Sequence, residues 1–306
     1  MNKLVSIILP TYNTGRFIND MFMSIIKQTY RPIQLVIVDD FSTDNTYENL
    51  KILIEQSKVK DITFKIMKNN SNIGLTQTVN KAFNECNGDF VFLSDHDDIW
   101  AENKIKEQVG YLEKKEDTVI CFHDRKIIND QNTIICSSEY KYINFKKELA
   151  TEKEVLTKKI RYSANTLCFK NIKEANLIFP IPSDIIEHDY YLALCFSLFG
   201  NIQYINKPLI EYRVHSNNIS GNYALETTNG YRNYKKIIKK NKNRSNKIIK
   251  NDIVILEKHI KEKLNRDIQI KVVHDKKGIK NLIKQKIPLF HYMYIQIILK
   301  KKFSAL

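Results

Sequence analysis

An acidic segment in the first third of the chain carries residues whose types and spacing suit metal chemistry. Asp95-His96-Asp97-Asp98 follows a short apolar run at 90–93. Carboxylates two positions apart in a loop after a strand can bind one hard cation, and Mg²⁺ or Mn²⁺ bound in this way keeps positions open for phosphate oxygens. Such an ion stabilises the charge that develops on a departing diphosphate. Because aspartates are also common in turns, this segment alone only slightly favours a metal site over an acidic turn.

The elements that must position this segment follow from the pattern of apolar residues before it. Four apolar runs of strand length lie at 5–9, 35–38, 62–67 and 90–93, and apolar residues at helical spacing separate them. Strands that are apolar throughout are buried on both faces, as in parallel sheets covered by helices. We therefore expect an α/β domain.

Polar segments follow all four predicted strands. They are Pro10-Thr11-Tyr12-Asn13, then 39–44 with three aspartates, then 69–74 with three asparagines, and last 94–98. Ligands of open α/β sheets bind at the carboxyl ends of the strands. Several carboxylates on one edge repel one another unless cations neutralise them. The pattern predicts a site for a cation and a ligand at this edge.

The rest of the chain is less regular, and its charge is uneven. We expect strands at 118–123, 166–169, 202–205 and 209–214, and a helix at 185–199. The net charge is +15, but residues 232–306 hold 22 Lys and Arg against 5 Asp and Glu, so the basicity belongs to the C-terminal quarter. The five cysteines are odd in number and lack CxxC spacing, which disfavours disulfides and zinc and fits a reducing cytoplasm. The first residues do not look like a signal peptide.

Five segments, taken together and in order, resemble the motifs of glycosyltransferase family 2, whose members are inverting enzymes with the GT-A fold. The segments are VSIILPTYN, VIVDDFSTDNT, NIGLTQTVNKAF, GDFVFLSDHDDIW and EHDYYLALCFSLFGNIQYINKPLIEYRVHSNNISG. The last is similar to the rhamnosyltransferase-like branch found among bacterial capsule and O-antigen enzymes. The resemblance covers about residues 3–222 and leaves the basic tail unmatched.

The resemblance implies a role for each matching residue. Asp97 would be the direct metal ligand, and His215 a second protein ligand or a diphosphate contact. Asp40 would accept a hydrogen bond from the pyrimidine N3–H, which suits a group that only accepts. The full set of implied nucleotide-sugar contacts is Pro10, Thr11, Tyr12, Asn13, Asp39, Asp40, Asn72, Gly74, Asn80, Asp95 and Arg213. For Arg213, support of the local fold is the alternative to a diphosphate contact.

The same resemblance identifies a candidate for the general base. Asp189 matches the carboxylate that removes a proton from the acceptor hydroxyl as it attacks the anomeric carbon, and Glu187 is the second choice. Acidic residues also favour helix starts for electrostatic reasons, so a purely structural role is the competing interpretation.

The fold and substrates are implied in the same way. We expect a GT-A (Rossmann-like) α/β domain at 1–225, with a mixed, mainly parallel sheet flanked by helices. Its nucleotide-binding half would be 1–115 and its acceptor half 116–225, and a basic α-helical extension would follow at 226–306. The expected donor is dTDP-rhamnose, with a UDP-hexose or UDP-N-acetylhexosamine as the alternative. The expected acceptor is a saccharide, typically lipid-linked, in surface polysaccharide synthesis.

The basic tail predicts where the enzyme works. Its amphipathic pattern and the aromatic run at 287–299, which is too short to span a bilayer, suit an anionic membrane surface. We expect a cytoplasmic protein, peripheral at the inner face of the cell membrane. No nucleic-acid-binding module is recognised, so nucleic acid is not an expected partner.

Three other classes of protein remain open on this sequence. A haloacid-dehalogenase-type phosphatase also uses Asp-x-Asp, but after its first strand. A nucleotidyltransferase would need a glycine-rich loop after the first strand, where only Gly15 is present. A catalytically inactive sugar-nucleotide-binding subunit is the non-enzymatic alternative, although Asp40, Asp97 and Asp189 are intact. Release of a nucleoside diphosphate separates these classes.

Overall fold

The computed structural model describes residues 2–142, 144–150, 163–173, 175–185, 188–197, 199–215 and 255. These residues contain the nucleotide-binding half predicted for 1–115 and most of the acceptor half. The helical extension predicted for 226–306 lies outside the described residues except for Ile255. The domain boundaries therefore stay predictions.

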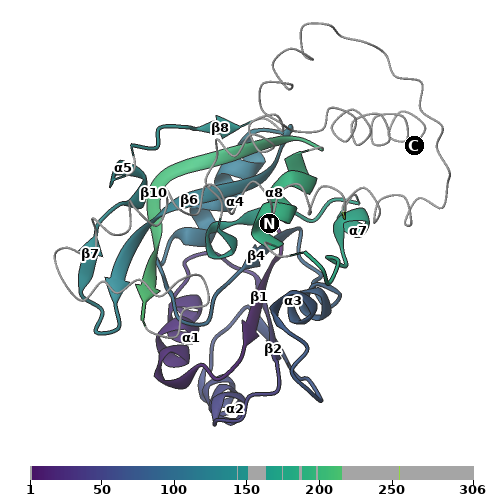
Figure 1. Cartoon of the computed structure of the whole chain (residues 1–306), viewed down its shortest axis with the longest axis vertical. Helices are drawn as coiled ribbons and strands as arrows, with labels where there is room; N and C mark the ends of the chain where they lie inside the picture. Colours follow the sequence, from purple (N-terminus) through teal and green to yellow (C-terminus); the bar gives the residue numbers. More distant parts are fainter. Residues whose placement is uncertain are drawn as a thin grey trace, which may run out of the picture.

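The first hundred residues form the alternating strands and helices that the apolar pattern predicts (Figure 1). The elements are β1 (Val5–Thr11), η1 (Gly15–Phe17), α1 (Ile18–Ile26), β2 (Ile33–Asp39), α2 (Thr46–Gln56), β3 (Ile62–Lys68), α3 (Leu75–Phe83) and β4 (Phe90–Leu93). Every residue of β1, β2 and β4 is buried, whereas in β3, an edge strand of the sheet, only Ile62 is buried and the other residues are half-buried or exposed.

The second part adds antiparallel strands and corrects one expectation. Its elements are β5 (Ile99–Trp100), α4 (Lys104–Lys114), β6 (Thr118–Asn129), β7 (Ile134–Cys136), α5 (Glu139–Tyr142), β8 (Leu149–Ala150), η2 (Ala164–Thr166), β9 (Cys168–Lys170), α7 (Ala175–Ile178), α8 (His188–Ser197) and β10 (Asn201–Val214). The two strands expected at 202–205 and 209–214 are one strand, β10. Pro208 shifts the register but does not end the strand, because β6 pairs with β10 on both sides of it.

The described strands join one mixed sheet in the order β3-β2-β1-β4-β9-β6-β10-β5, while β7 pairs with β6 and β8 with β10. The strands β1 to β4 run parallel, as do β6 and β10, whereas β9 lies antiparallel between β4 and β6. The carboxyl ends of β1, β2, β3 and β4 therefore meet at one edge. This confirms the expected mainly parallel α/β architecture.

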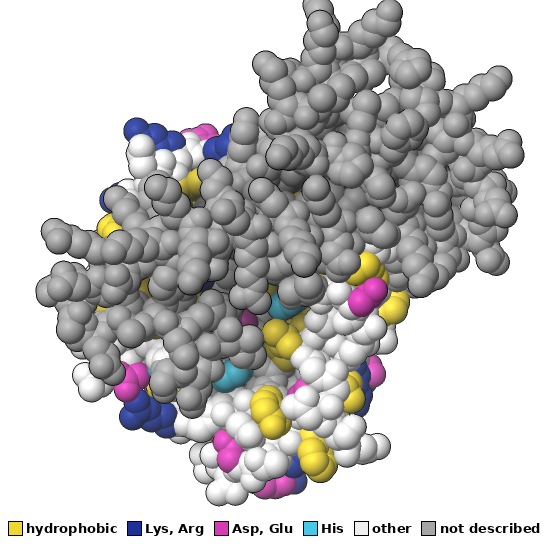
Figure 2. Space-filling view, viewed as in Figure 1, with side chains coloured by type: hydrophobic (Ala, Val, Ile, Leu, Met, Phe, Trp, Pro, Cys, Tyr) yellow, Lys and Arg dark blue, Asp and Glu magenta, His cyan; other side chains and the backbone are white. Residues whose placement is uncertain are grey.

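Alternate residues of the strands fill two hydrophobic cores, one on each face of the sheet. Ile8 of β1 packs with α3, α7 and α8, whereas its neighbours Ile7 and Leu9 pack with α1, α2 and α4. Helices thus cover both faces, and this burial is the main source of stability for the strands that carry the polar edge. Figure 2 shows hydrophobic side chains interrupting the polar surface of the described part of one face. Among the described residues, no helix is long and apolar enough to cross a membrane.

Gly88 allows β4 to lie directly beside β1, and this gives a first prediction. A Cβ at Gly88 would lie 2.4 Å from the backbone nitrogen of Ser6, whereas a Cβ at Gly110, inside α4, meets nothing within 4 Å. We expect Gly88→Ala to lower the free energy of unfolding by about 1–3 kcal/mol through overpacking. The control Gly110→Ala should raise it by about 0.5–1 kcal/mol, because alanine is the better helix former. Urea denaturation measures both, and equal stabilities would contradict this account of the β1–β4 contact.

Candidate functional site

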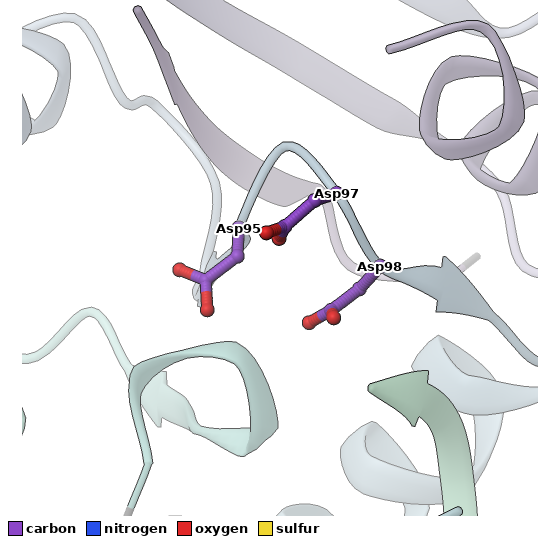
Figure 3. Close-up of side chains that lie close together, drawn as sticks. All are labelled: Asp95, Asp97 and Asp98. Carbon is purple, nitrogen blue, oxygen red and sulfur yellow. The ribbon is translucent and has the colours of Figure 1, made fainter. Parts of the chain in front are cut away.

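Three carboxylates converge in the loop between β4 and β5. Ligand oxygens of Asp95, Asp97 and Asp98 lie within 4.8 Å of one another, and Figure 3 shows the side chains turned toward a common side of the loop. Asp97 and Asp98 are buried and Asp95 is half-buried. Three acids so close together and so poorly solvated repel strongly, so the loop suits a site that binds a cation.

His215, directly after β10, completes this group from a distant part of the chain. Its Nε2 lies 3.0 Å from Asp97 Oδ2, and its ring packs against Phe17 at 4.8 Å between centroids. An imidazole nitrogen beside carboxylate oxygens fits Mn²⁺, and the oxygens also fit Mg²⁺. The residues present therefore fit the divalent ion that the resemblance implies.

The electrostatics of the three acids differ with their surroundings. Burial, together with the charges of Asp97 and Asp189, raises the pKa of Asp95 to about 7. Burial acts in the same direction on Asp97, but the hydrogen bond with His215 and nearby histidine charges outweigh it and leave the pKa below its ordinary value. Burial, together with the charges of Asp97 and Asp95, raises the pKa of Asp98 well above its ordinary value, so Asp97 is the one acid of the three whose pKa is lowered.

Asp40, at the carboxyl end of β2, organises the loop after β3. Its Oδ1 accepts hydrogen bonds from Asn69 Nδ2 and Ile73 N–H, and its Oδ2 accepts one from Gly74 N–H, all at 2.8 Å. Gly74 has a φ of 84°, a conformation that favours glycine. Asp40 therefore fixes the backbone of the segment that contains Asn72 and Gly74, both of which were predicted to contact the nucleotide.

Asp39 and Thr11 make a second internal connection at this edge. Asp39 is fully buried and accepts hydrogen bonds from Thr11 Oγ1, Ser42 N–H and Ser42 Oγ. Ser42 Oγ in turn accepts from the Asn13 N–H at 2.9 Å. These bonds join the segments after β1 and β2, in which Tyr12 and Phe41 are exposed aromatic side chains.

Two predicted contacts of the nucleotide sugar have internal partners in the structure. The Asn80 side chain pairs with the backbone of Ile181: its Nδ2 donates to the carbonyl oxygen at 2.8 Å, and its Oδ1 accepts from the N–H at 2.6 Å. Arg213 is buried, and its guanidinium donates to the backbone oxygen of Asp97, to Asp20 and to Asn132. For Arg213 this matches the alternative of supporting the local fold.

Comparisons with known proteins agree with this geometry. Residues 6–172 match the family model described as glycosyl transferase family 2. The chain belongs to this family. It is 29% identical over 226 residues to the Escherichia coli UDP-Glc:alpha-D-GlcNAc-diphosphoundecaprenol beta-1,3-glucosyltransferase WfgD, an alignment that covers 73% of this chain and 82% of that one. It is 30% identical over 228 residues to an uncharacterized glycosyltransferase of Haemophilus influenzae, which covers 73% of this chain and 69% of that relative.

Solved structures show the same fold. The Staphylococcus aureus TarS 1–349 structure in complex with UDP-GlcNAc gives a TM-score of 0.58 at 17% identity, covering 95% of this chain and 78% of that one. The mannosyltransferase PcManGT from Pyrobaculum calidifontis, in complex with GDP-Man and Mn²⁺, gives 0.57 at 16% identity, covering 100% and 75%. Against the longer TarS chain the match spans only 37% of that protein's length. The family and the GT-A fold are thus confirmed, and the chain is a glycosyltransferase.

Of the two acids predicted for the acceptor side, the structure describes Asp189. Asp189 is half-buried in the first turn of α8, where its Oδ1 accepts the Tyr190 N–H at 2.8 Å. Its negative charge contributes to the raised pKa of Asp95. Glu187 lies outside the described residues. The catalytic role of Asp189 stays a prediction.

Sequence reasoning missed two buried residues of the network next to the acidic loop. Asn165 of η2 donates from Nδ2 to Asp98 Oδ2 at 2.5 Å, and Lys104 of α4 is fully buried with Nζ 2.8 Å from Gln108 Oε1 and from His123 Nε2. Burial lowers the pKa of Lys104 to about 7. The one available signal was a lysine at the start of an amphipathic helix, which ordinarily predicts a solvated side chain.

The role of Asp40 gives a second prediction. In Asp40→Asn only one side-chain oxygen remains to accept, so at least one of the three donors of the loop after β3 loses its partner. We expect the free energy of unfolding to fall by about 1–3 kcal/mol and nucleotide affinity to fall at least about tenfold. Calorimetry with UDP and urea denaturation measure the two effects. The matched control is Asp61→Asn, at the exposed turn before β3, which should behave like the parent, and a loss as large as that of Asp40→Asn would refute the assignment.

Proposed function

We propose that this glycosyltransferase moves a sugar, with inversion, from a pyrimidine-diphosphate donor to a saccharide acceptor. The observation that carries the proposal is the meeting of two sets of groups at one sheet edge. One set, at the ends of β1, β2 and β3, is organised by Asp39 and Asp40. The other is the pair of Asp97 and His215, with Asp95 beside it. The first set suits a nucleoside and the second its diphosphate and cation.

The donor we propose is a UDP-sugar. WfgD and a second Escherichia coli relative, WfaP, which is 29% identical over 228 residues covering 73% of this chain and 82% of that one, are both named as transferases that use UDP-Glc. These names support UDP over the dTDP-rhamnose expected from the sequence. Uracil and thymine present the same N3–H, so Asp40 does not separate them, and its oxygens already hold the loop after β3. The exposed ring of Tyr12 offers an apolar face for either base.

Asp97 and His215 would hold a divalent ion, with Asp95 as the third group. When bound, this ion neutralises the negative charge that builds up on the departing diphosphate. Arg213 keeps the acidic loop in place through the Asp97 backbone oxygen, and Phe17 keeps the imidazole oriented. Asp189 would accept the proton of the attacking hydroxyl, because it is a half-buried acid in the first turn of α8 whose charge helps to raise the pKa of Asp95.

The acceptor we propose is a lipid-linked saccharide at the membrane surface. The names of WfgD and WfaP specify a diphosphoundecaprenol-linked GlcNAc, which is a substrate of this kind. The basic C-terminal region, with 22 Lys and Arg in residues 232–306, supports attraction to anionic lipid. Most of that region lies outside the described residues, so this part of the proposal rests on the amino-acid sequence.

Metal-dependent release of nucleoside diphosphate tests the donor and the metal site. With Mn²⁺ we expect UDP release from UDP-Glc or UDP-GlcNAc to exceed dTDP release from dTDP-rhamnose, and to stop when EDTA removes the metal. Asp97→Asn should lower turnover by about 10²-fold or more, a loss of about 3 kcal/mol of transition-state stabilisation. Asp61→Asn is the matched control and should retain parental turnover. Donor binding without metal-dependent release in the presence of acceptor would instead favour an inactive sugar-nucleotide-binding subunit.

Substitution of Asp189 tests the general base separately. Asp189→Asn keeps the size and the acceptor oxygen for the Tyr190 N–H but cannot take a proton. We expect turnover to fall about 10²- to 10⁴-fold while the affinity for UDP measured by calorimetry changes less than about threefold. Equal losses of turnover and UDP affinity would show that Asp189 supports the site's structure and is not the base.

A further inference from the structure

Asp98 differs from the two other acids of its loop in how completely the protein encloses it. Asp98 has no exposed surface, whereas Asp97 is 7% exposed and Asp95 is half-buried. Its Oδ1 accepts the Arg213 N–H of β10 at 3.1 Å, and its Oδ2 accepts Asn165 Nδ2 of η2 at 2.5 Å. Each oxygen therefore already has a donor from a different element.

The donor of the shorter bond is itself held in place from two sides. Asn165 is fully buried, and its Oδ1 accepts Ser163 Oγ at 2.8 Å, which fixes the direction of the Nδ2 group. The Ser163 hydroxyl accepts in turn from Arg125 Nη1 at 3.3 Å. The backbone oxygen of Asn165 accepts Lys104 Nζ at 3.3 Å. Asn165 thus cannot rotate its amide without breaking a second hydrogen bond.

Lys104 joins this network to the core. The three acceptors around its Nζ are Gln108 Oε1, His123 Nε2 and the backbone oxygen of Asn165, which matches the three donors of an ammonium group. The ring of Trp100 lies 4.4 Å from the same Nζ. The helix α4, the strand β6 and the turn η2 therefore meet behind Asp98.

We propose that Asp98 is a positioning residue that anchors the acidic loop to β10 and η2, and that it does not bind the metal. Asp98 follows Asp97 in the chain, and Arg213 lies two residues before His215. The hydrogen bond from Arg213 N–H to Asp98 consequently brings the two segments together next to the point where His215 meets Asp97 at 3.0 Å. This inference deepens the proposed function, on which it rests, by dividing the three clustered acids into ligands and an anchor.

A reciprocal exchange of Asp98 and Asn165 distinguishes the two roles. Asp98→Asn sets two amide donors against each other, and Asn165→Asp sets two carboxylates against each other, so each should lower turnover and Mn²⁺ affinity at least about tenfold. The double variant Asp98→Asn/Asn165→Asp restores one donor and one acceptor and keeps the total charge. We expect its turnover and Mn²⁺ affinity to return to within about threefold of the parent. A double variant as impaired as Asp98→Asn would overturn the proposal, because the loss of a carboxylate that binds the metal directly is not repaired by a new carboxylate at position 165.

The readouts separate this proposal from the proposed function. Mn²⁺ affinity is followed in the presence of UDP through quenching of Trp100, the only tryptophan, and thermal midpoints report folding. If the parent releases no nucleoside diphosphate from any sugar nucleotide, the proposed function fails, whereas the pattern of Mn²⁺ affinities still decides the role of Asp98.

Asn165→Ala is a second variant for the case in which Asn165→Asp does not fold, because it removes the hydrogen-bond donor to Asp98 without adding charge. Parental turnover and Mn²⁺ affinity in Asn165→Ala would also overturn the anchor.

The matched control is an Asn–Asp pair far from the site. Asn201 Nδ2 donates to Asp117 Oδ2 at 2.7 Å at the exposed amino end of β10. Asn201→Asp makes the same chemical change against the same kind of partner. It should leave turnover and Mn²⁺ affinity within about twofold of the parent, and a tenfold loss here would show that the effects at Asn165 are not specific to the acidic loop.

Discussion

Repulsion between carboxylates gathered on one sheet edge is the constraint that shapes this protein. The parallel arrangement of β1 to β4 brings Asp39, Asp40 and the acidic loop to the same edge of the sheet. Hydrophobic cores occupy both faces of the sheet, so these acids lie at its edge. Unpaired charge of one sign in a poorly solvated place costs several kcal/mol. The fold is therefore stable only if each acid has its own compensation.

The structure meets this constraint differently for each acid. Asp39 and Asp40 are compensated by hydrogen bonds from neighbouring loops, and in doing so they shape the segments that we assign to the nucleotide. Asp98 is compensated by donors from β10 and η2. Asp97 pairs with the imidazole of His215 at 3.0 Å, and in the proposed site a divalent cation would compensate its charge. Of the three acids in the loop, Asp97 is the one paired with an imidazole and with a lowered pKa, which suits it to bind an added positive charge.

Local patterns explain which parts of this arrangement could be predicted from the sequence. The alternation of β1 to β4 with α1 to α3 was predictable because the spacing of apolar residues in each segment matches the residues that the structure buries. The polar residues after the strands indicated the edge where the candidate site lies. Separate strands at 202–205 and 209–214 were wrong because pairing with β6 outweighs the local effect of Pro208. The proximity of Asp97 and His215, 118 positions apart, came only from the family resemblance. Neither Asn165 nor Lys104 was foreseen, because their importance comes from tertiary burial and not from any local motif.

The two halves of the domain depend on each other through the groups that hydrogen-bond the acids. The segments after β1, β2 and β3, which we assign to the nucleotide, are joined within the first half through bonds such as Asn13 N–H to Ser42 and Gly74 N–H to Asp40. The acidic loop also belongs to the first half, but its compensating groups Asn165, Arg213 and His215 come from the second. The proposed metal site therefore needs β9 and η2 packed against β4, and β10 joined to the sheet through β6. Because Asp189 belongs to the same half as these groups, packing of the second half against the first would bring together the proposed cation site and the candidate base.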